Sequence, residues 1–128
     1  MKKMLISLFL LIAASAFGQT DNAECRKFRS GSFYYVNETG DTVHITRNGR
    51  RQQERNMKTK VLTKFRMNWT SDCSYELLQT WSNSRKMREY NGTVTRITMT
   101  VRNGSSYNYT CACKDVPGKS NSGIIFRR

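Results

Sequence analysis

Alternation of apolar and polar residues with a period of two runs through this chain. It is clearest in residues 65–69 and 73–77, where aromatic, thioether and aliphatic side chains occupy every second position between charged or small polar ones. This pattern predicts β-strands with one buried and one wet face, and no stretch reads as a convincing amphipathic helix. The expected strands are residues 32–36, 42–47, 50–55, 61–70, 73–81, 93–102, 106–114 and 123–127.

The segments between these strands are mostly short and contain Asn, Asp, Ser and Gly. Seven or eight short strands joined in this way predict an all-β antiparallel meander. An open sheet would leave two unpaired edges, so the meander is expected to form a curled sheet or a lipocalin-like barrel.

The segment 61–81 predicts one hairpin, with residues 70–72 as its loop. The inward pairs are then Trp69 with Cys73, Met67 with Tyr75, Phe65 with Leu77 and Val61 with Trp81. On the opposite face Arg66 lies across from Glu76, a favourable cross-strand pair. A slip of one residue would scatter both patterns, which is why we expect this register.

Two further hairpins follow from their turn residues. With residues 103–105 as a loop, the inward pairs are Val101 with Tyr107, Met99 with Tyr109 and Ile97 with Cys111. Asn48-Gly49 suggests a two-residue turn, which pairs Ile45 with Gln52 and Val43 with Glu54 but also sets Arg47 opposite Arg50.

The first residues, MKKMLISLFLLIAASAFGQ, have the form of a secretory signal peptide. Lys2 and Lys3 precede an apolar run, and small residues flank a cut expected after Gly18. We therefore expect a signal peptide over residues 1–18 and a single β-domain over 19–128. Removing the two lysines from a chain of formal charge +13 leaves +11. The apolar run is too short for a transmembrane anchor, so we expect an exported protein, periplasmic or extracellular. We also expect it to be a monomer.

The motifs CRKFRSGSF, ITRNGRRQQE and FRMNWTSDCSYEL resemble those of an uncharacterised family of small exported bacterial β-proteins. They cover most of residues 25–77. Some members of that family carry a topoisomerase IV label, which this chain does not support. It is too short for an ATPase or cleavage domain and has no phosphate-binding glycine loop. The resemblance implies fold and export rather than an activity. Gly31-Ser32-Phe33 also resembles the Gly-x-Trp that begins lipocalin-type barrels.

Four cysteines remain after the predicted cleavage: Cys25, Cys73, Cys111 and Cys113. Export favours disulfides over a metal or redox pair, and few other ligands could complete a metal site. Cys25 is expected to tie the N-terminal segment to Cys73 or to the Cys111–Cys113 strand, with Cys73 preferred. A direct Cys111–Cys113 bond would require a distorted strand.

Three polar residues share a face with apolar neighbours in the second and third strands: Arg47, Gln52 and Glu54. If this face points inward, they form a polar cluster in an apolar lining, as in a ligand pocket. The alternative is an Arg–Glu pair that closes one end of the barrel. His44, the only histidine, is expected on the opposite, wet face, which argues against a ribonuclease-like arrangement with Arg47 and Glu54.

Basic residues are densest between positions 47 and 64. This surface is expected to attract polyanions through Arg50, Arg51, Arg55, Lys58 and Lys60. Exposed aromatics for base stacking are few, so we do not expect specific nucleic-acid binding.

The sequence therefore predicts an exported, non-enzymatic β-domain that binds a small acidic or amphipathic ligand. The alternatives are an envelope or extracellular protein that binds polyanionic surfaces and, last, a small secreted hydrolase or nuclease. No catalytic residue, metal site or cofactor can be assigned from the residues.

Overall fold

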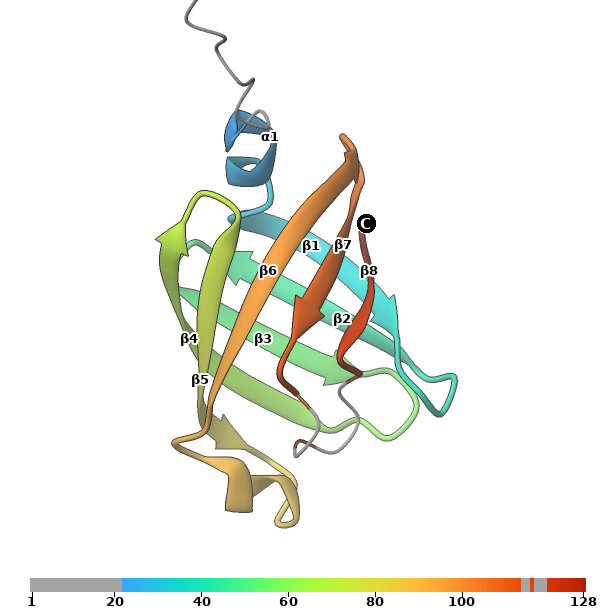
Figure 1. The fold of residues 1–128 in the computed structure, drawn as a ribbon. Coiled ribbons are helices and arrows are strands. Elements are labelled where there is room, and N and C mark those ends of the chain that lie inside the picture. The colour runs from blue at the N-terminus through green and yellow to red at the C-terminus, as the bar shows by residue number, and fades with distance from the viewer. Residues whose placement is uncertain (1–21, 114–115, 117–119) are drawn as a thin grey trace, which may run out of the picture.

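The computed structural model describes residues 22–113, 116 and 120–128, and shows a closed barrel of eight antiparallel strands in chain order (Figure 1). The strands are β1 (Ser30–Val36), β2 (Thr42–Asn48), β3 (Arg51–Asn56), β4 (Leu62–Ser71), β5 (Ser74–Ser82), β6 (Val94–Asn103), β7 (Ser106–Cys111) and β8 (Ser122–Arg127). The predicted all-β meander is confirmed, and the sheet closes rather than staying open. The predicted signal peptide lies outside the described residues.

The barrel closes where β8 returns to β1. Phe33 pairs with Arg127 and Tyr34 with Phe126. The Arg128 N–H adds a bond of 2.9 Å to the Ser32 carbonyl. Closure leaves no long edge strand open to another chain.

Alternate side chains of every strand fill the interior, as the period of two predicts. The buried apolar core from the strands is Phe33, Val43, Ile45, Phe65, Met67, Tyr75, Leu77, Ile97, Met99, Tyr107 and Ile125. One glycine is required by this packing, because a Cβ at Gly123 would lie 2.8 Å from the Tyr109 hydroxyl.

The predicted register of β6 and β7 is confirmed. Ile97 pairs with Cys111, Met99 with Tyr109 and Val101 with Tyr107. The strand predicted over residues 106–114, however, ends at Cys111.

The predicted register of β4 and β5 was wrong by two residues. Met67 pairs with Leu77 and Trp69 with Tyr75, while Asn68 rather than Arg66 lies opposite Glu76. The inward faces were assigned correctly, and the Trp69 and Tyr75 rings are 4.8 Å apart. The chain turns more tightly than the predicted loop, since Ser71 already pairs with Ser74.

A β-bulge changes the far end of the same hairpin. The register shifts between Lys64 and Phe65, so Lys64 rather than Val61 pairs with Trp81. One extra residue reverses which face the following positions occupy. Trp81, predicted to be in the core, is therefore 42% exposed, with Lys64 Nζ 5.1 Å from its ring centroid.

The predicted register of β2 and β3 was also wrong by two residues. Arg47 pairs with Gln52 and Ile45 with Glu54, so Arg47 does not face Arg50. Gly49 adopts a φ of 93°, which a residue with a Cβ rarely does. Asn48 Oδ1 accepts the Arg51 N–H at 2.9 Å and stabilises the turn.

The two ends of the barrel differ (Figure 1). At the closed end, the turns after β2, β4 and β6 are short, and helix α1 (Asn22–Arg26) lies at the same end, bonded to the β4–β5 turn through Cys25. The Phe28 side chain, just after α1, is fully buried with its ring 5.0 Å from that of Tyr107. The open end carries the β1–β2, β3–β4 and β5–β6 connections, including the 3-10 helix η1 (Met87–Tyr90), and β7 ends and β8 begins there.

Candidate functional site

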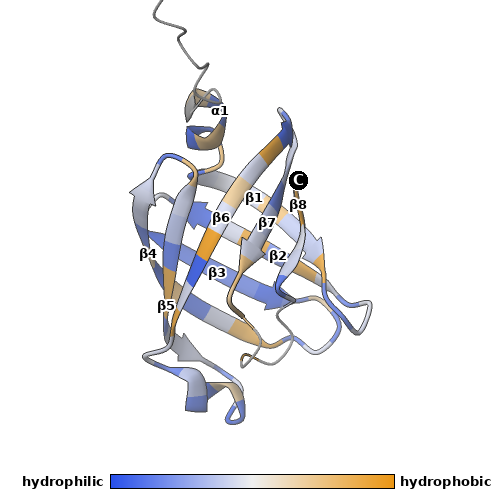
Figure 2. Ribbon diagram, in the orientation of Figure 1, coloured by the Kyte–Doolittle hydropathy of each residue, from blue (hydrophilic) through white to orange (hydrophobic). Residues whose placement is uncertain are grey.

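Strand β3 is hydrophilic along its whole length (Figure 2), although alternate side chains point into the barrel. Gln52 and Glu54 from β3 and Arg47 from β2 are all buried, at 2%, 7% and 4% exposure. The three predicted candidates thus share the inner face. A buried charge is costly unless other groups satisfy it, so their hydrogen bonds decide what they do.

Gln52 connects the other two residues. Arg47 Nε donates to Gln52 Oε1 at 2.7 Å, and Gln52 Nε2 donates to Glu54 Oε2 at 2.9 Å. The amide oxygen accepts from the positive Arg47, and the amide nitrogen donates to the negative Glu54. The charges of Arg47 and Glu54 cancel. Arg47 and Glu54 therefore do not need to touch.

The remaining donors of Arg47 point to the closed end. Nη1 donates to the Phe28 carbonyl at 3.1 Å, and Nη2 donates to the hydroxyls of Tyr75 and Tyr107 at 2.9 and 2.7 Å. The guanidinium carbon also lies 5.0 Å from the ring centroid of Phe33. Arg47 is thus held by protein groups on several sides and closes this end of the interior.

Burial shapes the protonation of this cluster. Burial raises the pKa of Tyr75 well above its usual value, against the opposing effect of Arg47. The Arg47 pKa is also raised: burial lowers it, but the phenols of Tyr107 and Tyr75 and the charge of Glu54 outweigh that effect. Arg47 is therefore a cation beside the neutral phenol of Tyr75 at any physiological pH.

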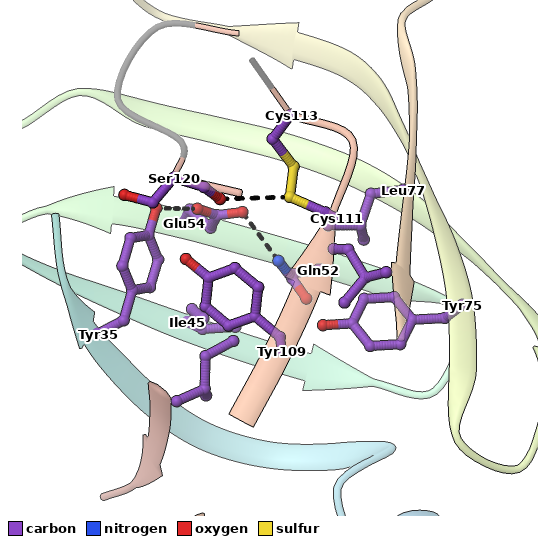
Figure 3. A pocket seen from close by; sticks show the side chains of 12 residues that line it. Tyr35, Ile45, Gln52, Glu54, Tyr75, Leu77, Tyr109, Cys111, Cys113 and Ser120 are labelled. Atoms are coloured by element: carbon purple, nitrogen blue, oxygen red, sulfur yellow. Dashed lines mark hydrogen bonds between the residues drawn. A yellow bond between two sulfur atoms is a disulfide. The ribbon is translucent and has the colours of Figure 1, made fainter. Parts of the chain in front are cut away.

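Glu54 marks the boundary between this cluster and a small inner cavity of about 30 Å³ (Figure 3). Tyr35 Oη donates to Glu54 Oε1 at 2.7 Å. Tyr109 also lines the cavity, and burial followed by the charge of Glu54 raises its pKa. The cavity is large enough to hold water but far smaller than a typical small-molecule site.

A larger cavity of about 410 Å³ opens beyond Tyr35 and Glu54 at the open end; we call it the mouth. Val43, Val61, Phe65 and Met87 give it an apolar part. Its polar lining is Asn37, Thr39, Asp41, Asn56, Thr59, Thr63, Ser84 and Lys86, together with Tyr35 and Glu54. Hydrogen bonding by Asn56 lowers the pKa of Asp41, which is therefore charged at neutral pH.

Both pairs of cysteines form disulfides. Cys25–Cys73 ties α1 to the β4–β5 turn, with the Cα atoms 5.2 Å apart, which confirms the preferred pairing. Cys111 and Cys113 also bond to each other, with Cα atoms 5.3 Å apart. The chain leaves the strand after Cys111, and this provides the distortion that such a bond was expected to need. Both residues line the inner cavity.

His44 lies on the outer face, as predicted, opposite Tyr34 and Arg55 on the neighbouring strands. Its Nδ1 is 3.0 Å from Arg128 Nη1. Burial, Arg128 and Lys60 all lower its pKa, so it is neutral at neutral pH. It faces away from Arg47 and Glu54.

The predicted polyanion-binding residues are all exposed: Arg50, Arg51, Arg55, Lys58 and Lys60. Lys58 Nζ lies 4.0 Å from Asp41 at the rim of the mouth. Arg50 and Arg51 lie at the other end, in the β2–β3 turn and at the start of β3. The five residues therefore do not form one site.

Sequence reasoning missed three residues that line or close the interior: Phe28, Tyr35 and Tyr109. Tyr109 had been placed on an inward face but given no role. The Tyr35 position could have been found from the alternation in β1, since Phe33 and Tyr35 share a face. Phe28 could not, because its burial depends on α1 folding across the barrel end.

Within the described part of the chain, no group of three or more His, Cys, Asp or Glu side chains could hold a metal ion. No helix among the same residues is long and apolar enough to span a membrane. Comparisons with protein-family models, curated proteins and solved structures find no match to this chain. The resemblance to small exported bacterial proteins therefore stays a prediction.

Proposed function

We propose that this protein is an exported, non-enzymatic binding protein that holds a small amphipathic ligand in the mouth of its barrel. The observation that carries the proposal is the cavity of about 410 Å³ at the open end, within the size range of small-molecule sites. The two disulfides support export to an oxidising compartment.

The lining favours an amphipathic ligand over an acidic one. Phe65, Val43 and Met87 offer apolar contacts, while amides and hydroxyls around them offer hydrogen bonds. The acids Asp41 and Glu54 line the mouth, whereas Arg47 is directed toward the closed end and held by Phe28, Tyr75 and Tyr107. Lys86 is the one basic residue in this lining, so the two acids outnumber it and the mouth disfavours an anionic head group relative to a neutral or cationic one.

The chemistry of the site supports binding rather than catalysis. A hydrolase or nuclease would need a nucleophile and a base in hydrogen-bond reach. The four cysteines are bonded in pairs and supply no thiol. The only histidine lies on the outer face beside Arg128. No specific observation favours the enzyme alternative.

The test uses a matched pair of valines, one directly before β4 and one at the start of β6. Val61 lines the mouth, whereas Val94 is 50% exposed and does not. A neutral amphipathic fluorophore, N-phenyl-1-naphthylamine, would be titrated into the protein and the variants Val61→Asp and Val94→Asp. We expect Val61→Asp to weaken binding about tenfold or more, since a charge replaces about 1.4 kcal/mol of apolar contact. Val94→Asp should leave it unchanged.

Thermal unfolding of both variants would verify that they fold alike. Equal affinities for the two variants, or no binding by the wild-type protein, would overturn the proposal. Native mass spectrometry of protein purified from its own host would then identify any ligand that it retains.

A further inference from the structure

A second cavity lies on the outside of the barrel, away from the mouth. It measures about 450 Å³ and is lined by Gly49, Arg50, Arg51, Arg66, Met67, Asn68 and Trp69. We call it the arginine cleft. It lies at the closed end, where the β2–β3 turn meets β3 and β4, and three of its seven lining residues are arginines.

Two of these arginines directly oppose each other. Arg51 on β3 pairs with Arg66 on β4, both on the outer face of the sheet. Like charges directly opposite one another destabilise a sheet. The sequence had suggested Glu76 as the partner of Arg66 on β5, but in the observed register Arg66 pairs with Leu78 and Glu76 pairs with Asn68. The arrangement therefore lacks the neutralising pair that the sequence predicted.

Neighbouring acids do not compensate for this charge. Glu76 lies 3.6 Å from Arg96, and Asp72 lies 3.2 Å from Arg29 and 3.5 Å from Arg26. None of the three arginines of the cleft makes an ion pair with another described residue. A bound anion would relieve the repulsion and match the planar fork of a guanidinium.

Positive charge continues beyond the cleft along the same face. On β4, Lys64 is the next outward residue after Arg66, about 7 Å along the strand. On β3, Gln53 lies opposite Lys64, and Arg55 is the next outward residue after Gln53. The exposed Trp81 ring lies beside Lys64 on β5. This spacing fits a polymer with repeated anionic groups rather than a single small anion.

We propose that the outer face of β3 and β4 binds an acidic polysaccharide, with Arg50, Arg51 and Arg66 holding its carboxylate or sulfate groups. A flat aromatic face such as Trp81 can pack against a sugar ring. Single-stranded nucleic acid usually needs successive stacking aromatics along its path, and here the Trp69 ring at the cleft is already covered by Arg29 and Tyr75, which leaves Trp81. The proposal does not depend on the ligand in the mouth.

The test compares two variants with the same loss of charge. One is R50Q/R51Q/R66Q, which removes the three positive charges that line the arginine cleft. The other is R85Q/R88Q/R102Q, which removes three exposed arginines that line neither cavity. Affinity for heparin oligosaccharides, polygalacturonate and oligo(dT) would be measured over a range of salt concentrations.

We expect the wild-type protein to bind at least one of the two polysaccharides more tightly than oligo(dT) at equal ionic strength. R50Q/R51Q/R66Q should lower that affinity about tenfold or more through lost charge-assisted hydrogen bonds, and should reduce its salt dependence. The control should change it about twofold, as net charge alone would.

Three results would overturn the proposal: equal losses in both variants, tighter binding of oligo(dT), or no polysaccharide binding by the wild-type protein. Thermal unfolding gives a second measurement. The polysaccharide should raise the melting temperature of the wild-type protein and of R85Q/R88Q/R102Q, but not of R50Q/R51Q/R66Q, since only ligands that bind the folded state stabilise it.

Discussion

Polar side chains enter the barrel at both ends, but they do different things there. At the closed end, Arg47 is held by Gln52, Tyr75, Tyr107 and the Phe28 carbonyl. At the open end, the polar residues share the lining of a cavity of about 410 Å³ with apolar ones. The same kind of residue stabilises the fold where protein groups surround it, and becomes a candidate for binding where space remains beside it.

The connections explain this difference. The turns at the closed end are two residues long, at 49–50, 72–73 and 104–105, and α1 is bonded to one of them through Cys25. The segment between β5 and β6 at the open end is much longer and includes η1. Tight turns bring the strands and the helix close enough to fill the interior. Longer connections extend past the strands and form the walls of the mouth.

Arg47→Ala should produce the largest effect. It would leave the buried hydroxyls of Tyr75 and Tyr107 bonded only to each other, and it would remove the positive charge that balances Glu54. We expect a loss of about 3–5 kcal/mol in the free energy of unfolding, measured with urea. Arg55→Ala, on the outer face of β3, should cost about 0.5 kcal/mol or less. If Arg47→Ala were as stable as Arg55→Ala and lost only ligand binding, the closed end would be the binding site.

The disulfide at the closed end should stabilise the protein more than the disulfide at the open end. Cys25 and Cys73 are 48 residues apart, so replacing both with Ser should cost about 4 kcal/mol from loop entropy. Cys111 and Cys113 are 2 apart, and their replacement should cost only about 1 kcal/mol. Urea unfolding of both double variants would measure the difference. Equal losses would show that the open end is as important for stability as the closed end.

Two methionines offer a matched comparison of interior and mouth. Met67 is buried in the core, whereas Met87 in η1 is half-buried at the edge of the mouth. Met67→Ala should cost about 3 kcal/mol because it leaves a cavity. Met87→Ala should cost less than about 1 kcal/mol. Thermal unfolding distinguishes them, and a larger loss at Met87 would contradict a loosely packed open end.

The smallest effect should appear at alkaline pH. Burial raises the pKa values of Tyr75 and Tyr109 above that of an unfolded tyrosine, about 10. Folding therefore favours the neutral phenols. The stability that this preference contributes is fully present below about pH 10, the unfolded pKa, and is lost as the pH rises through the higher folded pKa. Unfolding measured from pH 9 to 11 should show falling stability. Tyr75→Phe should flatten that slope more than Tyr109→Phe, since Tyr75 is more deeply buried; the reverse order would contradict the comparison.

Which face each residue occupies could be predicted from the sequence wherever the strands are regular. Arg47, Gln52 and Glu54 point inward, and His44 points outward, because side chains alternate along a strand whatever its partner. The β6–β7 pairs from Ile97–Cys111 to Val101–Tyr107 were also predicted correctly from the turn residues after Asn103, whereas the equally short turns after β2 and β4 did not reveal their registers.

Pairing across strands depended on features outside the alternation. The β2–β3 and β4–β5 registers moved by two residues, which preserves every face and so leaves the alternation unchanged. The bulge at Lys64 then moved Trp81 to the surface. A prediction from pattern alone cannot detect these shifts, and the β4–β5 shift decided that Arg66 faces Leu78 on β5 instead of Glu76.

The sequence by itself determined the all-β class, the meander and the face of most residues, because these follow from neighbours along the chain. The tertiary structure alone decided which end is closed, that Arg47 is held by Phe28, Tyr75 and Tyr107, and that an open cavity lies beyond Glu54. These features bring together residues far apart in the sequence. Their positions depend on barrel closure and on the packing of α1 across one end.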